Sequence, residues 1–360
     1  MFWKLHRNDR EQDMRELTKL LTDFFSYAAA QGGTSLDESA FRKAFSQNAQ
    51  WLLDQFHGGQ KNRIELKQAV KELFQMSPAR RRVIAQAVAH DMDFDSTADP
   101  SHFFFAVPSL SPEEQAVIKA FFKYFYETAF ERRQGPTING RVSGAVRSKF
   151  SQAYYQANKT MRYACPICLH PNSDATQEND LEHYFPKGVY SPLILHPFNL
   201  LFICKYCNET YKHTEDVLQA GRQPLSGVFL PYRDTVKEHA KVVIRREDNK
   251  DCVKLLALDG TVEKQKKIEN FNRLYQLEKR WSSDIERMFE QTRKCCAGRN
   301  LSREELRRKL DEMCKDLQAL SDFPDKFLES VYLDWLCETM FDAFYDSLQP
   351  ASGTGTDDIS

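Results

Sequence analysis

The sequence lacks the long apolar runs that membrane-spanning helices require. No stretch of about 18 consecutive apolar residues occurs in the chain. The N-terminal residues, MFWKLHRNDREQDM, also lack the apolar centre of a secretory signal. We therefore expect a cytoplasmic protein with no membrane contact. Because thiols stay reduced in that compartment, the nine cysteines indicate metal binding or burial rather than disulfides.

The sequence also has little excess charge and no glycine-rich phosphate loop. Its formal net charge is −1, which excludes a surface coated in basic residues for bulk nucleic-acid binding. Without a Walker-type loop, any ATP must be bound by another protein. Apolar material, in contrast, is ample, since 41% of the residues are hydrophobic and 26 are phenylalanine. A chain of 360 residues with this composition is expected to form two or three domains.

Helical patterns dominate both ends of the chain. Ser-x-x-Glu capping boxes are expected at Ser35, Ser111 and Ser302. The expected helices cover 9–30, 78–90, 112–133, 145–160, 264–296, 303–320 and 323–347, and the expected strands cover 241–247 and 252–258. The fold class is therefore expected to be mainly α with a small α+β insertion.

Composition divides the chain into four regions. An N-terminal helical region covers 1–140 and ends within a breaker-rich segment, 134–144. The middle region, 141–230, contains paired cysteines. Residues 231–349 contain the short strand pair and the C-terminal helices. The tail, 350–360, has no core-forming residues and is expected to be disordered.

Four of the cysteines have the spacing of zinc ligands. Cys165 and Cys168 form one C-x-x-C pair, and Cys204 and Cys207 form another. Two such pairs complete a tetrahedral Cys₄ zinc site. The 35 residues between the pairs exceed the usual gap of about 15–20, so the site must close around an inserted element. The remaining cysteines have no ligand-like spacing and are expected to be core or surface thiols: Cys252, Cys295, Cys296, Cys314 and Cys337.

The inserted element contains polar residues in a set order. The order is C-x-x-C, Glu-His-x-x-Pro, Asn-Leu and C-x-x-C-Asn, all within 165–212. In this order and spacing the segment resembles the HNH endonuclease family. The resemblance implies a ββα-metal finger with a Cys₄ zinc site, embedded between helical regions. It also implies that 141–230 is a nuclease domain with a basic lead-in.

The resemblance implies a role for each residue of the motif. His183 matches the general base, a role that suits a neutral imidazole. Glu182 and Asn208 match the ligands of one catalytic ion, Mg²⁺ or Mn²⁺, which prefers oxygen donors. Asn199 matches the asparagine that shapes the loop between the two finger strands. The four clustered cysteines would bind structural zinc, with no open position for catalysis.

Basic residues near the motif are candidates for nucleic-acid contact. They are Arg147, Lys149, Lys159, Arg162, Lys187 and Lys212. Aromatic residues alternate with the first four: Phe150, Tyr154, Tyr155 and Tyr163. Basic groups neutralise phosphates and aromatic faces stack on exposed bases, so this stretch is a candidate substrate-guiding face. The alternative is a basic amphipathic helix whose aromatic side chains lie in the core.

The resemblance favours a metal-dependent nuclease that hydrolyses phosphodiester bonds of nucleic acid, with DNA as the favoured substrate. Stand-alone proteins of this HNH form resemble effector nucleases of bacterial anti-phage systems such as the Septu type, which implies an ATPase partner. RNA cleavage and a non-catalytic, zinc-stabilised binding or adaptor module are the alternatives. Because one finger cuts one strand at a time, a double-strand break needs two events or two copies, so a homo-oligomer is possible.

Overall fold

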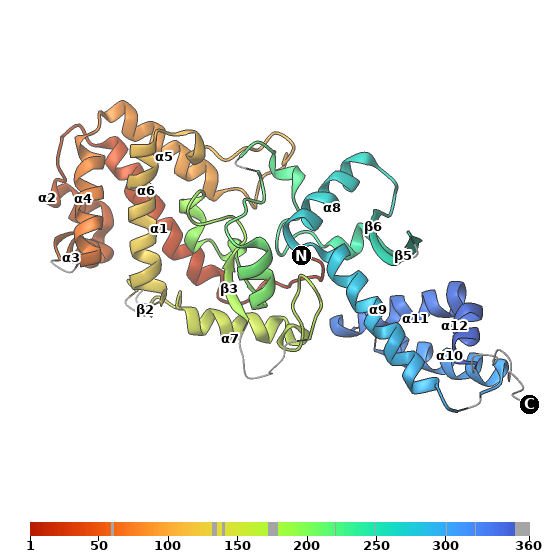
Figure 1. Cartoon of the computed structure of the whole chain (residues 1–360). Coiled ribbons are helices and arrows are strands. Elements are labelled where there is room, and N and C mark those ends of the chain that lie inside the picture. Colours follow the sequence, from red (N-terminus) through yellow and green to blue (C-terminus); the bar gives the residue numbers. More distant parts are fainter. Residues whose placement is uncertain are drawn as a thin grey trace, which may run out of the picture. The chain divides into compact units, whose positions relative to one another are not determined.

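The computed structural model describes most of the chain. The described residues are 1–58, 61–131, 135–138, 141–171, 179–219, 221–248, 250–299, 301–320 and 322–349. The tail 350–360, which the sequence predicts to be disordered, lies outside them. Within the described residues the chain is mainly helical and contains small two-stranded antiparallel sheets, which confirms the predicted class at this level (Figure 1).

The chain divides into two compact units. The first contains Met1, residues 3–159 and residues 178–235, and the second contains Phe2, residues 160–177 and residues 236–360. This division follows spatial contacts rather than composition, so its boundaries differ from the sequence regions 1–140, 141–230 and 231–349. Those regions remain a prediction.

Among its described residues, the first unit contains seven α-helices, four short strands and two π-helical segments. The helices are α1 (Glu11–Ala30), α2 (Glu38–Phe45), α3 (Ala49–His57), α4 (Lys61–Gln75), α5 (Pro78–Met92), α6 (Pro112–Phe125) and α7 (Arg147–Ala157). The strands are β1 (Thr137–Ile138), β2 (Arg141–Val142), β3 (Asp180–His183) and β4 (Leu200–Ile203), and the π-helical segments are η3 (Tyr126–Glu131) and η7 (Tyr206–Lys212). Helix α1 packs along α5, and α4 packs along α6.

Local capping determines where several helices begin. Ser111 and Glu114 form the predicted capping box at α6, with Pro112 in the first turn. Ser302 and Glu305 form another at the start of α10 (Arg303–Ala319). The capping box predicted at Ser35 is wrong. There the cap is Asp37, whose side chain accepts the Ala40 N–H at 3.0 Å.

Aromatic side chains form the core of the helical part of the first unit. Phe24 on α1 stacks on Phe121 of α6 with ring centroids 4.8 Å apart. Its neighbour Phe25 stacks on Phe122 with centroids 5.7 Å apart. All four side chains are buried. Stacked rings of this size bury large apolar areas, so α6 is held firmly in place against α1.

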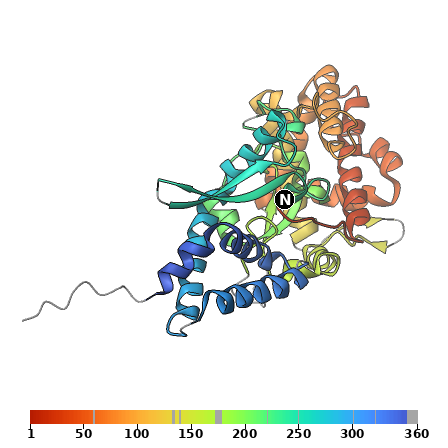
Figure 2. The same cartoon turned by 90° about the vertical axis from the view of Figure 1, so that its right-hand side faces the viewer.

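The second unit combines a long β-hairpin with the C-terminal helices. Strands β5 (Ala240–Glu247) and β6 (Lys250–Ala257) pair antiparallel in a twisted ribbon (Figure 2). The helices are α8 (Val262–Tyr275), α9 (Leu277–Cys296), α10, α11 (Phe327–Trp335) and α12 (Phe341–Leu348), and the π-helical segment η11 (Leu336–Met340) joins the last two. Trp281 of α9 is fully buried, and its ring packs against the Phe2 ring in a T-shaped arrangement with centroids 4.8 Å apart.

Two long predicted helices, 264–296 and 323–347, are interrupted in the structure, the second by the π-helical segment η11. The predicted helix 264–296 is broken at Gln276, whose φ of 48° is left-handed. The Asn272 carbonyl accepts the Gln276 N–H at 2.7 Å, and the Asn272 side chain accepts the Glu278 N–H at 3.0 Å. These bonds end α8 and begin α9 without glycine or proline. Among the described residues, no helix has the length and apolar character needed to cross a bilayer.

Candidate functional site

The Glu-His pair lies on a short strand whose partner is completely buried. Strands β3 and β4 pair antiparallel, with Glu182 opposite Leu201 and His183 opposite Leu200. All four residues of β4 are buried, whereas only His183 of β3 is. The π-helical segment η7 begins three residues after β4 ends, and it presents Asn208 and Lys212 to the strand pair.

Asn199 holds the loop between these strands. It is fully buried, and its side-chain oxygen accepts the Phe185 N–H at 2.7 Å. Its amide group donates to the carbonyls of Phe185, at 3.1 Å, and Leu193, at 3.0 Å. One amide side chain therefore satisfies three buried backbone groups, as a loop without regular pairing requires. Aromatic packing of Phe185 against Phe94 and Phe105 fixes the same loop against the helical part of the first unit.

His183 is a buried and neutral histidine. Its Nε2 atom lies 3.0 Å from the Ile194 carbonyl oxygen. Because a carbonyl only accepts hydrogen bonds, Nε2 must carry the hydrogen, and Nδ1 of the neutral ring keeps its lone pair. Burial, with help from the positive charge of Lys187, lowers the pKa of His183 to about 3. The ring is therefore unprotonated at neutral pH.

Glu182 forms a buried ion pair with Lys212. The Lys212 ammonium bonds to the Glu182 carboxylate and also donates to the His183 carbonyl at 3.1 Å. Burial raises the pKa of Glu182, and the nearby lysine opposes that effect. Lys212, a candidate for nucleic-acid contact, has a side chain only 1% exposed. The structure thus assigns it a position inside the site, beside the carboxylate.

Asp180 is a neighbour of Asn208 that the motif does not include. The Asn208 amide group lies 3.4 Å from the Asp180 carboxylate, so its own oxygen remains available as a donor atom toward a ligand. Asp180 and Glu182 are two residues apart on β3 and therefore point to the same face. That i, i+2 spacing is visible in the sequence and is the signal that would have found Asp180.

A cavity of about 600 Å³ connects these residues to solvent. Its lining includes Glu182, His183, Asn208 and Lys212 from the motif, together with Lys187 from the loop. Lys119, Lys123 and Tyr126 also line it. These three residues lie on α6 and η3 and were not predicted. Glu182, His183, Asn208, Lys212 and Lys187 therefore share one cavity, whereas Asn199 is not part of its lining.

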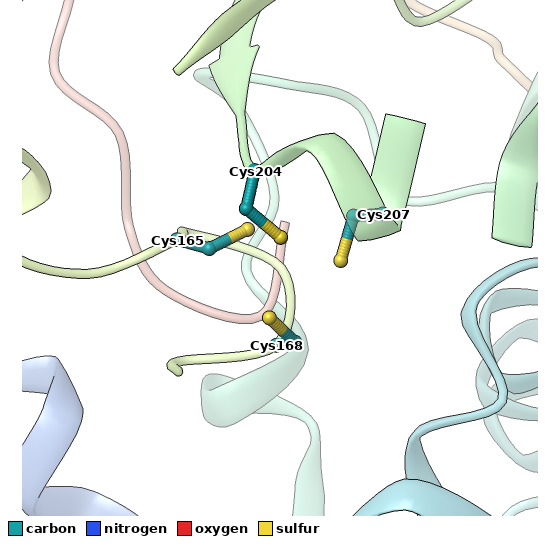
Figure 3. A group of neighbouring side chains, drawn as sticks. All are labelled: Cys165, Cys168, Cys204 and Cys207. Atoms are coloured by element: carbon teal, nitrogen blue, oxygen red, sulfur yellow. The ribbon is translucent and has the colours of Figure 1, made fainter. Parts of the chain in front are cut away.

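The four paired cysteines converge on one point. Their sulfur atoms all lie within 4.8 Å of one another (Figure 3). A tetrahedral zinc site with Zn–S bonds of about 2.3 Å has sulfurs roughly 3.8 Å apart, so small shifts would complete it. Thiolates are the ligands that zinc selects, and four of them leave no open position. The cluster can therefore hold a metal such as zinc in a structural site.

The first cysteine pair sits in a tight turn held by its surroundings. The Leu169 N–H donates to the Cys165 carbonyl at 2.9 Å, and the Cys165 N–H donates to the His170 carbonyl at 3.1 Å. Leu169 has a φ of 62°, a left-handed conformation that costs a non-glycine residue about 1–2 kcal/mol. The indole N–H of Trp281 donates to the Cys168 carbonyl at 3.0 Å, which fixes the turn to α9.

The basic lead-in differs from the predicted substrate-guiding face. Phe150, Tyr154 and Tyr155 are buried, so they are core residues of α7 and do not stack on bases. Tyr163, in contrast, is 56% exposed. Arg147 pairs with Glu131 at 3.0 Å. The basic candidates Arg147, Lys149, Lys159 and Arg162 are outside the lining of the cavity around His183.

No family model, curated protein or solved structure matches this chain. The function must therefore be argued from the geometry of the site itself.

Proposed function

We propose that this protein is a metal-dependent endonuclease of the HNH kind, which hydrolyses phosphodiester bonds of nucleic acid, with DNA favoured over RNA. One observation carries the proposal. A neutral histidine with a free Nδ1 lone pair lines the same cavity as a carboxylate and an amide oxygen donor. A general base next to oxygen ligands for a hard cation is what metal-assisted phosphodiester hydrolysis requires.

The donor atoms suit Mg²⁺ or Mn²⁺. Glu182 and Asn208 would hold the ion through oxygen atoms, which hard divalent cations prefer. The Lys212 ammonium beside Glu182 supports this assignment, because its positive charge favours the ionised carboxylate that a metal ion requires. When bound, the ion would supply charge stabilisation for the phosphate and the leaving oxygen. Zinc at the four clustered cysteines would hold the chain around β3 and β4 together.

His183 acts as the general base in this scheme. Its Nδ1 accepts a proton from the attacking water, while the Nε2–H bond to Ile194 keeps the ring in the required tautomer. The low pKa keeps the ring unprotonated before substrate enters. A phosphodiester anion beside the ring favours the imidazolium form and so raises the pKa during the reaction. Asn199 preserves the loop that carries the Ile194 carbonyl.

The wider role follows from the resemblance of the motif. We propose that the nuclease is the effector of an anti-phage defence system and works beside an ATPase partner, since the sequence contains no phosphate loop of its own. Cutting of both strands would then require two events or a homo-oligomer.

Cleavage assays with and without added Mg²⁺ test this function. Wild type is incubated with supercoiled plasmid and, in parallel, with single-stranded RNA, and Mg²⁺ is omitted rather than chelated so that zinc is retained. We expect Mg²⁺-dependent cleavage, with plasmid preferred. Glu182→Gln on β3 should abolish the Mg²⁺ response, and Glu209→Gln, which changes an exposed carboxylate on η7, should not. Cleavage that needs no divalent ion, or survives in Glu182→Gln, would refute the proposal.

A further inference from the structure

The exposed face of α6 forms a wall of the cavity around His183. Lys119 and Lys123 are one helical turn apart, both are exposed, and both line that cavity. Lys187 lines it from the loop after His183. We call these three residues the lysine wall. They belong to the first unit, like every other residue of the cavity lining.

The helix that carries the lysine wall is tied directly to His183. Tyr126 begins the π-helical segment that continues α6, and its ring lies 5.2 Å from the His183 ring in an edge-to-face arrangement. The Lys187 ammonium lies 5.8 Å from the centre of the Tyr126 ring. Single-turn π-helical segments often occur at functional sites because they reposition side chains. Together with the Phe24 and Phe121 stack, this contact gives α6 a fixed position beside the base.

Little negative charge neutralises the lysine wall. Lys123 approaches Glu127 at 3.9 Å, but both side chains are more than a third exposed, so the pair is weak. No ion pair joins Lys119 or Lys187 to another described residue. The remaining carboxylate of the lining, Glu182, is already matched by Lys212. The wall therefore presents weakly compensated positive charge to the cavity.

We propose that Lys119 and Lys123 of α6, with Lys187, bind the backbone phosphates that flank the scissile phosphate of a nucleic-acid strand. This inference rests on the proposed nuclease function. It makes the N-terminal helical region part of the substrate cleft rather than a separate module. Ammonium groups contact phosphates without reading bases, so the contact orients the strand and confers no sequence preference.

The test is the salt dependence of substrate binding and cleavage. Lys119→Gln/Lys123→Gln is compared with wild type and with Lys67→Gln/Lys71→Gln, a control pair with the same spacing on the exposed face of α4 in the same unit. Each phosphate contact contributes about 0.9 to the slope of log affinity against log salt on duplex DNA. The double variant on α6 should lose roughly 1.8 from that slope, and its KM at low salt should rise about tenfold. Its kcat at saturating DNA and the control pair should stay near wild type.

Two outcomes separate this inference from the nuclease proposal. If wild type cleaves DNA and the α6 variant keeps the wild-type KM and salt slope, the lysine wall is refuted and the nuclease stands. If wild type cleaves nothing, the nuclease proposal fails. Binding of a labelled DNA duplex by the His183→Ala protein, with and without the two lysine changes, then decides the inference separately. An unchanged salt slope there, or no binding at all, would refute it.

Discussion

Two of the three antiparallel strand pairs in the described residues, β3–β4 and β5–β6, are held in different ways. Strands β5 and β6 are each eight residues long and pair without interruption around a two-residue connection. Strands β3 and β4 are each four residues long and are joined by the loop 184–199. The first pair is stabilised by its own ladder and turn. The second depends on buried side chains and on the cysteine cluster, two members of which precede β3 and two of which follow β4.

Side chains outside the strands form hydrogen bonds to the backbone in both pairs, but these bonds have different roles. On β6, the Val253 N–H donates to the Ser282 hydroxyl oxygen at 2.8 Å. The Leu255 N–H donates to the Glu278 carboxylate at 2.8 Å. These bonds protect an edge that is already formed. In the loop 184–199, Asn199 satisfies backbone groups that have no strand partner. The strand pair with candidate chemistry is therefore the one that its own backbone stabilises least.

Loss of a zinc ligand should produce the largest difference in stability between the β3–β4 pair and the β5–β6 pair. Structural zinc contributes on the order of 10 kcal/mol to folding, so Cys204→Ser should lose the metal and unfold the β3–β4 pair. The matched control is Cys252→Ser on β6, which removes a thiol outside the cluster. Zinc content by atomic emission and hydrogen exchange of both pairs measure the effect. Full zinc content in Cys204→Ser would disprove the Cys₄ assignment.

Replacement of Asn199 should have the next largest effect. Asn199→Ala leaves the buried N–H and carbonyl of Phe185 without a partner, at a cost of about 1–3 kcal/mol each, while the Leu193 carbonyl keeps its bond from the His196 N–H. We expect a loss of roughly 3 kcal/mol or more in the free energy of unfolding. Urea denaturation measures this loss. A loss below about 1 kcal/mol, the net contribution of one ordinary hydrogen bond, would contradict the role of Asn199 in the loop.

Acid should weaken the loop of the β3–β4 pair. Burial opposes ionisation of Asp95, but hydrogen bonds from His196 and Arg15 outweigh it and lower the pKa of Asp95 to about 2. Because this pKa lies below the usual value of 3.8, the stabilisation is present above pH 3.8 and is lost as the pH falls toward 2. The full stabilisation from the lowered pKa of Asp95 amounts to about 2 kcal/mol.

Stability between pH 6 and pH 3 should therefore fall less in Asp95→Asn than in wild type. Because His196 lies in the loop 184–199, hydrogen exchange at low pH should rise there before it rises in β5 and β6. Equal acid sensitivity of wild type and Asp95→Asn would contradict this account.

The smallest effect is expected at the turn of the β5–β6 pair. Asp248 has a φ of 49°, which glycine adopts without strain. Asp248→Gly should change the free energy of unfolding by less than about 0.5 kcal/mol. Urea denaturation of Asp248→Gly and Asn199→Ala under the same conditions compares their free energies of unfolding directly. A large loss in Asp248→Gly would mean that the aspartate side chain, rather than the backbone, holds the turn.

The contrast also explains which elements the sequence could predict. The strands 241–247 and 252–258 could be predicted because runs of β-branched and apolar residues are local signals, and β5 and β6 differ from the predicted ranges by one or two residues. The capping boxes at Ser111 and Ser302 are local as well. At Ser35 the same pattern failed because Asp37, two residues later, offers a competing acceptor.

The candidate site was only partly predictable for the same reason. The cysteine spacing predicted which four residues come together, since C-x-x-C turns form locally. The Glu182–Lys212 pair, the packing of Tyr126 on His183 and the lysine wall join residues far apart in the chain. Only tertiary packing determines such contacts. Burial of Tyr154 and Tyr155 likewise depends on what α7 packs against, so the pattern alone could not decide between a substrate-guiding face and aromatic side chains in the core.

The most direct test of the central claim is plasmid cleavage by His183→Ala at saturating DNA and Mg²⁺. Removal of a general base is expected to slow cleavage by about 10²–10⁴-fold, with zinc content and circular dichroism unchanged. His102→Ala, which changes a highly exposed histidine, should cleave at the wild-type rate. Cleavage by folded, zinc-loaded His183→Ala at the wild-type rate would contradict the assignment of this histidine as the base.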